Sequence, residues 1–235
     1  MKSATLNVMA LALALVFLPL THQASAATPA PGCDDIQVLP VEKLRRIQPN
    51  TTVDIVIENP NEVPQNYLNS LRSAIPNAAA NLSNKVDGIV FRNAASEGDN
   101  SSIMVRIQPK NPAELNLPPE YHDNIGAYSA SNGSNSWMQT GVIVIYMNQA
   151  HSECGGLCLD PEQSPELFNI ALQKLIEHEL GHALGADDSE KANFMYEAFF
   201  GKNNVSAPPR EIDCVTQRLQ QLLSGGGAPP PWSCN

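Results

Sequence analysis

The stretch PELFNIALQKLIEHELGHALGADD, residues 165–188, predicts a helix after which the chain turns sharply back. Ser164 followed by Pro165 is a typical helix start, because serine caps free backbone N–H groups and proline fits the first helical position. Gly185 is expected to end the helix in a left-handed conformation. Apolar residues recur at helical spacing and predict one buried stripe, formed by Leu172, Ile176, Leu180 and Ala183.

Within this helix, the segment His178-Glu179-Leu180-Gly181-His182 places two imidazoles one turn apart and on the same side. Their nitrogens can converge on one ion, and Glu179 can reach a water on that ion as a general base. A catalytic zinc site needs three protein ligands and one open position. The turn at Gly185 would return Asp188 to the metal as the third ligand, with Asp187 as its neighbouring competitor. The alternative is that the histidines are ordinary core or surface residues.

The sequence HELGHALGADDS, residues 178–189, followed by NFMY, residues 193–196, resembles the metzincin clan of metallopeptidases. It is closest to the matrixin-like branch, the matrix metalloproteinases and their bacterial relatives. The resemblance is sharp over residues 172–197 and looser over residues 51–223. It implies an α+β catalytic domain in which a twisted mixed β-sheet packs on helices, with an active-site helix and a C-terminal helix.

The resemblance also implies residue roles. Matrixins usually carry histidine as the third zinc ligand, whereas this chain has Asp188, as some clan members do. Met195 matches the methionine that forms a hydrophobic floor beneath the metal without binding it. The strand before the site resembles the edge strand on which the clan binds extended peptide, which implies substrate contacts at Val142, Ile143, Val144 and Ile145.

These features predict a zinc endopeptidase in which Glu179 activates a water on the zinc ion. The main alternative is a non-catalytic, metalloprotease-like binding module with a structural zinc. The presence of Glu179 argues against it, because zinc binding alone does not need that residue. A zinc hydrolase acting on non-peptide amides is a third interpretation.

Hydrophobic patterning predicts the remaining elements. We expect a helix over Val63–Asn84 with a kink or break at Pro76, a loop over residues 108–140, and a last helix over Pro209–Leu223. Strands are expected over Thr52–Ile57, Gly88–Phe91, Ile103–Ile107 and Gly141–Met147.

The chain has 235 residues, a formal net charge of −10 and a pI of about 4.9. Such an acidic surface argues against nucleic acid and anionic membranes as partners. We expect a protein or peptide substrate and a monomer.

Residues 1–27 have the pattern of a cleaved secretory signal, with an apolar run over Leu6–Leu20 and small residues at Ala24-Ser25-Ala26. The apolar run is shorter than the roughly 20 residues of a spanning helix, which argues against a membrane anchor. We therefore expect a secreted protein, extracellular or periplasmic. The expected organisation is a signal peptide (1–27), a leader or short pro-segment (28–50), a zinc metallopeptidase domain (51–224) and a flexible tail (225–235).

Five cysteines in an exported chain predict disulfides, with one thiol left over: Cys33, Cys154, Cys158, Cys214 and Cys234. A Cys154–Cys158 and a Cys214–Cys234 bridge are both plausible. Cys33 is either a disulfide partner or, by resemblance to the matrixin pro-segment, an inhibitory zinc ligand. A second zinc site at His122, Asp123 and His151 is not expected, and no stretch matches a calcium loop, so calcium stays unsupported.

Overall fold

The computed structural model describes residues 36–39, 47–98, 101–110, 112–119, 125–132, 137–146, 162, 165–189, 194–195 and 209–225, without the side chains of residues 132, 167 and 209–211. These residues form five strands, three α-helices and one short 3-10 helix, η1 (Ala113–Leu115). The predicted signal peptide lies outside them. None of the helices in the described ranges is both long enough and apolar enough to cross a membrane.

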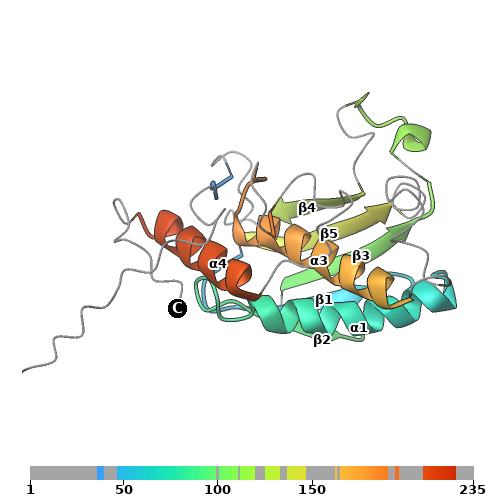
Figure 1. Ribbon diagram of the computed structural model, residues 1–235, viewed down its shortest axis with the longest axis horizontal. Coiled ribbons are helices and arrows are strands. Elements are labelled where there is room, and N and C mark those ends of the chain that lie inside the picture. The colour runs from blue at the N-terminus through green and yellow to red at the C-terminus, as the bar shows by residue number, and fades with distance from the viewer. Residues whose placement is uncertain are drawn as a thin grey trace, which may run out of the picture.

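A five-stranded mixed sheet forms the centre of the fold (Figure 1). Three neighbour pairs are parallel, and the strand that follows η1 pairs antiparallel at one edge. This is an α+β arrangement of a mixed sheet with helices, as expected. The strand order is β2 (Val90–Ala94), β1 (Thr52–Ile57), β3 (Ser101–Gln108), β5 (Met138–Tyr146), β4 (Gly126–Asn132).

Two helices, α1 (Gln65–Leu82) and α3 (Pro165–Leu184), lie side by side against this sheet (Figure 1). The apolar stripe predicted for α3 is buried, since each of its four residues is at most 2% exposed. The third helix, α4 (Pro209–Leu223), contacts α1 and has the bounds that the sequence predicted. Burial of these apolar faces is the main favourable contribution to the fold.

The strand register builds a continuous core beneath the helices. Ile55 lies opposite Ile103, and Val105 lies opposite Ile143, and all four side chains are fully buried. The core also includes Ile36 and Ile47, two residues of the predicted leader 28–50. Part of that leader therefore packs as one unit with the residues of the predicted catalytic domain.

Of the kink or break predicted at Pro76, the break is wrong, because α1 continues through the proline to Leu82. A proline inside a helix costs about 3 kcal/mol through a lost hydrogen bond and a steric clash. Leu71 and Ile75 before the proline and Ala78 and Leu82 after it are all buried in the same core. Tertiary packing on both sides of Pro76 therefore outweighs the local penalty.

The predicted loop over residues 108–140 is also wrong in part, because β4 occupies Gly126–Asn132 and β5 begins at Met138. The β4 sequence GAYSASN consists mostly of small and polar residues, which gives little local strand signal. Its pairing with β5 supplies the backbone hydrogen bonds that stabilise it.

This pairing overturns the expected role of Val142, Ile143, Val144 and Ile145. They lie in β5, which is an interior strand bonded to β3 on one side and to β4 on the other, so its backbone cannot add a peptide strand. The side chains of Ile143 and Ile145 are buried in the core, at 0% and 4% exposed. The edge strand nearest to α3 is β4 instead.

Candidate metal centre

The last turn of α3 and the chain that follows it form a tight cap. Gly185 has φ 102°, the left-handed conformation predicted for it. Its N–H donates to the carbonyl of His182 at 2.9 Å, and the N–H of Ala186 donates to the carbonyl of Gly181 at 3.0 Å. These two bonds make a Schellman motif, which reverses the chain directly after the helix.

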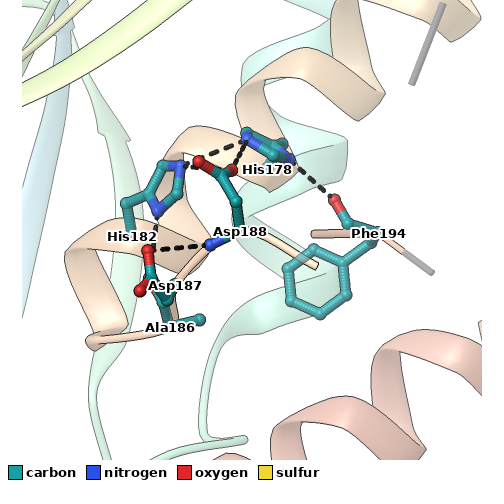
Figure 2. A network of polar contacts seen from close by, with 6 residues as sticks. All are labelled: His178, His182, Ala186, Asp187, Asp188 and Phe194. Carbon is teal, nitrogen blue, oxygen red and sulfur yellow. Dashed lines mark hydrogen bonds and ion pairs between the residues drawn. The ribbon is translucent and has the colours of Figure 1, made fainter. Parts of the chain in front are cut away.

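The reversal brings three ligand atoms together, from His178, His182 and Asp188 (Figure 2). The two Nε2 atoms are 3.1 Å apart. The Oδ1 atom of Asp188 lies 3.2 Å from Nε2 of His178 and 3.4 Å from Nε2 of His182. This group is the one set of His, Cys, Asp and Glu side chains within the described ranges that could hold a metal ion.

Backbone carbonyls orient both imidazole rings. Nδ1 of His178 lies 3.1 Å from the carbonyl oxygen of Phe194, and Nδ1 of His182 lies 2.9 Å from that of Ala186 (Figure 2). A carbonyl oxygen can only accept, so each Nδ1 carries the proton and donates it. In a neutral ring, Nε2 then presents its lone pair to Asp188, as in metal-binding histidines whose other nitrogen is held by a carbonyl.

This arrangement places three lone pairs toward one point. Repulsion between them is relieved by a cation, either a proton or a metal ion. With Zn–N and Zn–O bonds of about 2.0–2.1 Å, a tetrahedral ion would separate its ligand atoms by about 3.3 Å. The observed separations of 3.1, 3.2 and 3.4 Å fit that spacing. Two imidazole nitrogens and one carboxylate oxygen are also an ordinary zinc donor set.

The protonation of the metal-free group follows the same geometry. Burial lowers the pKa of His182, but the hydrogen bond to Asp188, the charges of Glu179 and Asp188 and the Ala186 carbonyl outweigh it and raise the pKa to about 9. Burial raises the pKa of Asp188, yet the two histidines hold that pKa well below its usual range. A metal ion must therefore displace a proton from this site at neutral pH.

The structure separates the two candidate third ligands. Asp188 faces the imidazoles, whereas Oδ1 of Asp187 accepts the backbone N–H of Asp188 at 3.0 Å (Figure 2). Asp187 thus supports the turn and does not belong to the group that could hold a metal. The side chain of Asp188 is 47% exposed, against 11% for His178, so the site opens to solvent on the carboxylate side.

Glu179 lies between the histidines in sequence but points to different neighbours. It is 3% exposed, and burial raises its pKa, while the charges of the two histidines oppose that rise. A Cβ on Gly126, the first residue of β4, would lie 2.7 Å from Oε1 of Glu179. The carboxylate therefore sits against the start of the edge strand, at a place where a glycine leaves room for it.

Met195 packs beneath the same helical turn. It is fully buried, and a Cβ on Gly181 would overlap its Sδ and lie 2.8 Å from Cε2 of Phe194. The carbonyl of Met195 accepts the N–H of Ser189 at 2.7 Å, which fixes the chain just after Asp188. Met195 therefore packs against the helical turn between the two histidines, and its role as a hydrophobic floor stays a prediction.

Several parts of the site had no sequence signal. The carbonyls of Ala186 and Phe194 orient the rings through the backbone, which residue type does not reveal. Gly126 was hidden in a segment predicted as loop, although a glycine opening a strand beside a helix is a sign of close approach.

Other predicted residues lie outside the described ranges, namely Cys33, His122, Asp123, His151, Cys154, Cys158 and Cys234. Cys214, in α4, is buried and disulfide-bonded, and its pairing with Cys234 stays a prediction.

Two comparisons with known proteins give no relative for this chain. No protein-family model matches it, and no curated protein is significantly similar to it.

Proposed function

We propose that this chain is an exported zinc endopeptidase related to the matrixin-like metzincins, with His178, His182 and Asp188 as metal ligands and Glu179 as the general base. The observation that carries the proposal is the convergence of three lone-pair donors at 3.1–3.4 Å, with both rings fixed by backbone carbonyls. Three protein ligands leave one coordination position for catalysis.

Glu179 is the residue that favours a hydrolytic zinc site over a structural one. A structural zinc site does not need a buried carboxylate beside its ligands, and burying one is costly. Burial raises the pKa of Glu179, which brings the carboxylate closer to the proton affinity that a general base needs near neutral pH.

A bound zinc ion supplies Lewis acidity, which lowers the pKa of water and polarises a carbonyl. Glu179 accepts a proton from the attacking water as the new C–O bond forms at the peptide carbonyl. Glu179 then donates that proton to the nitrogen as the C–N bond breaks, so the products are a carboxylic acid and an amine, which ionise to a carboxylate and an ammonium group at neutral pH. Asp188 and the histidines keep their places through the cycle because backbone groups hold them.

The substrate strand is proposed to lie along β4. No described strand pairs with the outer side of β4, and an edge of this kind can bind an extended peptide through backbone hydrogen bonds. Gly126 at the start of β4 lies beside Glu179, so a peptide on this edge would pass the general base. This replaces the substrate contacts expected on β5.

The test uses purified protein, metal analysis and digestion of casein and a peptide library. We expect about one zinc ion per chain, cleavage of extended peptides, loss of cleavage with a chelator and recovery when zinc is added back. A zinc-loaded protein that cleaves neither casein nor peptides would contradict the enzymatic proposal and favour a non-catalytic binding module. A protein that binds iron instead of zinc would contradict the metal assignment, since two histidines and one carboxylate also hold iron in oxygenases.

A further inference from the structure

A short segment from the N-terminal part of the chain pairs with the loop that carries the third ligand. Residues 36–39, here called the N-terminal clamp, run antiparallel to residues 185–187, and a β-bridge joins Val38 to Ala186. The two segments are almost 150 positions apart in sequence. Their contact is therefore a product of the tertiary fold.

Two backbone hydrogen bonds hold this pairing. The N–H of Leu39 donates to the carbonyl of Gly185 at 3.0 Å, and the N–H of Asp187 donates to the carbonyl of Gln37 at 2.9 Å. They flank Ala186, whose own carbonyl accepts Nδ1 of a metal-site histidine. The clamp thus holds both neighbours of a residue that orients an imidazole.

The clamp is itself anchored. Ile36 is 4% exposed and belongs to the main hydrophobic core, and Val38 packs against that core. Ala186, on the other side of the bridge, is fully buried. The clamp therefore connects residues 185–187, which have no regular secondary structure of their own, to the hydrophobic core.

Asp188 lies between two residues, Asp187 and Ser189, whose backbone N–H groups are both hydrogen-bonded. Asp187 before it is held by Gln37 of the clamp, and Ser189 after it is held by Met195. The Asp188 side chain is itself 47% exposed, so packing alone does not fix its direction. The hydrogen bonds on either side hold the backbone from which its carboxylate reaches the two histidines.

We propose that the N-terminal clamp is a positioning element of the metal site, which presets the third ligand and so sets the affinity for zinc. The proposal rests on the metal assignment made above. Partners that orient a metal ligand typically change metal affinity by about 10- to 100-fold when they are removed. The clamp acts through Asp188 and Ala186, and none of its residues belongs to the group that could hold the metal.

The test compares Leu39→Pro with Leu39→Ala in the full chain. Both variants remove the leucine side chain, but only proline removes the N–H that donates to Gly185. We expect Leu39→Pro to bind zinc about tenfold more weakly than Leu39→Ala, measured by competition with a chromophoric chelator. The leucine side chain is only partly buried, so Leu39→Ala should fold and serve as the matched control.

A second measurement does not depend on metal. Hydrogen exchange of the metal-free protein, followed by mass spectrometry, should show faster exchange across residues 185–189 in Leu39→Pro than in Leu39→Ala. Exchange across α1 should stay the same in both variants, which separates loosening of the loop from general unfolding.

The outcomes separate this inference from the proposed function. If wild type binds zinc and the two variants bind it equally well, the clamp does not position the ligand and the inference is wrong. If α1 loses protection as well in Leu39→Pro, the clamp is a general stability element, and the inference is wrong in that form too. If wild type binds no zinc, the metal assignment fails, while faster exchange would still show that the clamp holds the loop.

Discussion

Two glutamates on α3, Glu177 and Glu179, occupy similar burial but opposite chemical settings. Glu177 is 4% exposed, and its Oε1 accepts N–H groups from Asn81 at 2.7 Å and from Gln173 at 2.9 Å. Burial raises its pKa, and these two hydrogen bonds oppose the rise. Glu179 is about as buried, but its carboxylate lies against the start of β4, and burial raises its pKa while the charges of the two histidines lower it.

The difference lies in whether hydrogen-bond donors surround the buried carboxylate, and it favours a structural role for Glu177 and the catalytic role proposed for Glu179. The carboxylate of Glu177 accepts hydrogen bonds from α1 and from its own helix, so it links the two helices. These hydrogen bonds satisfy the buried group without a metal ion. The cluster beside Glu179 gathers acceptors around one point and needs a cation to be stable. Burial alone would not have distinguished the two sites.

The largest expected effect is on catalysis. Glu179→Gln should lower peptide hydrolysis by about 100- to 10,000-fold, the usual contribution of a general base, while zinc binding is retained. Glu177→Gln makes the same chemical change two residues away and should leave the rate unchanged. It should cost about 1 kcal/mol of unfolding free energy, because a charge-assisted hydrogen bond becomes neutral. The hydrolysis rate on a fluorogenic peptide would measure the effect on catalysis, and urea unfolding would measure the effect on stability. Equal rate losses in the two variants would contradict the proposed role of Glu179 as the general base.

The next effect is on metal affinity. Asp188→Ala should weaken zinc binding at least about 100-fold, since it removes a ligand and not merely a partner of one. Asp187→Ala removes only the side chain that accepts the N–H of Asp188 and should have a much smaller effect. Chelator competition on the two purified variants gives the comparison. A larger loss in Asp187→Ala would assign the third ligand to the other aspartate.

The smallest effect is on the pH dependence of stability. In the metal-free protein the pKa of His182 is raised from 6.5 to about 9, so its contribution is complete below pH 6.5 and is lost as pH rises toward 9. This loss amounts to at most about 3 kcal/mol. The stabilisation that zinc adds should instead grow over the same window, because fewer protons compete for the site.

Urea unfolding of metal-stripped and zinc-loaded protein at pH 6.5, 7.5 and 8.5 would test these opposite trends. Asp188→Asn is the control, since it removes a charge that raises the pKa of His182, and its metal-free stability should depend less on pH. If the free energy of unfolding falls equally with rising pH in metal-stripped and in zinc-loaded protein, zinc and protons do not compete at the histidine cluster.

Local patterns predicted the elements whose own residues carry the signal. The strand Thr52–Ile57 and the helix Pro209–Leu223 were predicted with the bounds found, and α3 ends at Leu184 before a left-handed glycine. In contrast, β4 was missed, because a strand of small and polar residues depends on its partner. The edge role was assigned to β5 by its resemblance to the edge strand of the metzincins, and sequence order does not reveal the order of strands in a sheet.

By itself the sequence determined that two imidazoles would share one side of a helix, that a glycine would reverse the chain after it, and that an acidic residue would return toward them. Helical periodicity and the conformational freedom of glycine are local properties, so residue spacing suffices. The sequence favoured Asp188 and left Asp187 as a competitor, and the tertiary structure decided that Asp188 is the one that faces the imidazoles. That choice depends on where residues 36–39 and Met195 hold the backbone, through hydrogen bonds between segments distant in sequence. The pairing of β5 with β3 on one side and with β4 on the other likewise decided that β4, and not β5, lies at the sheet edge beside the site.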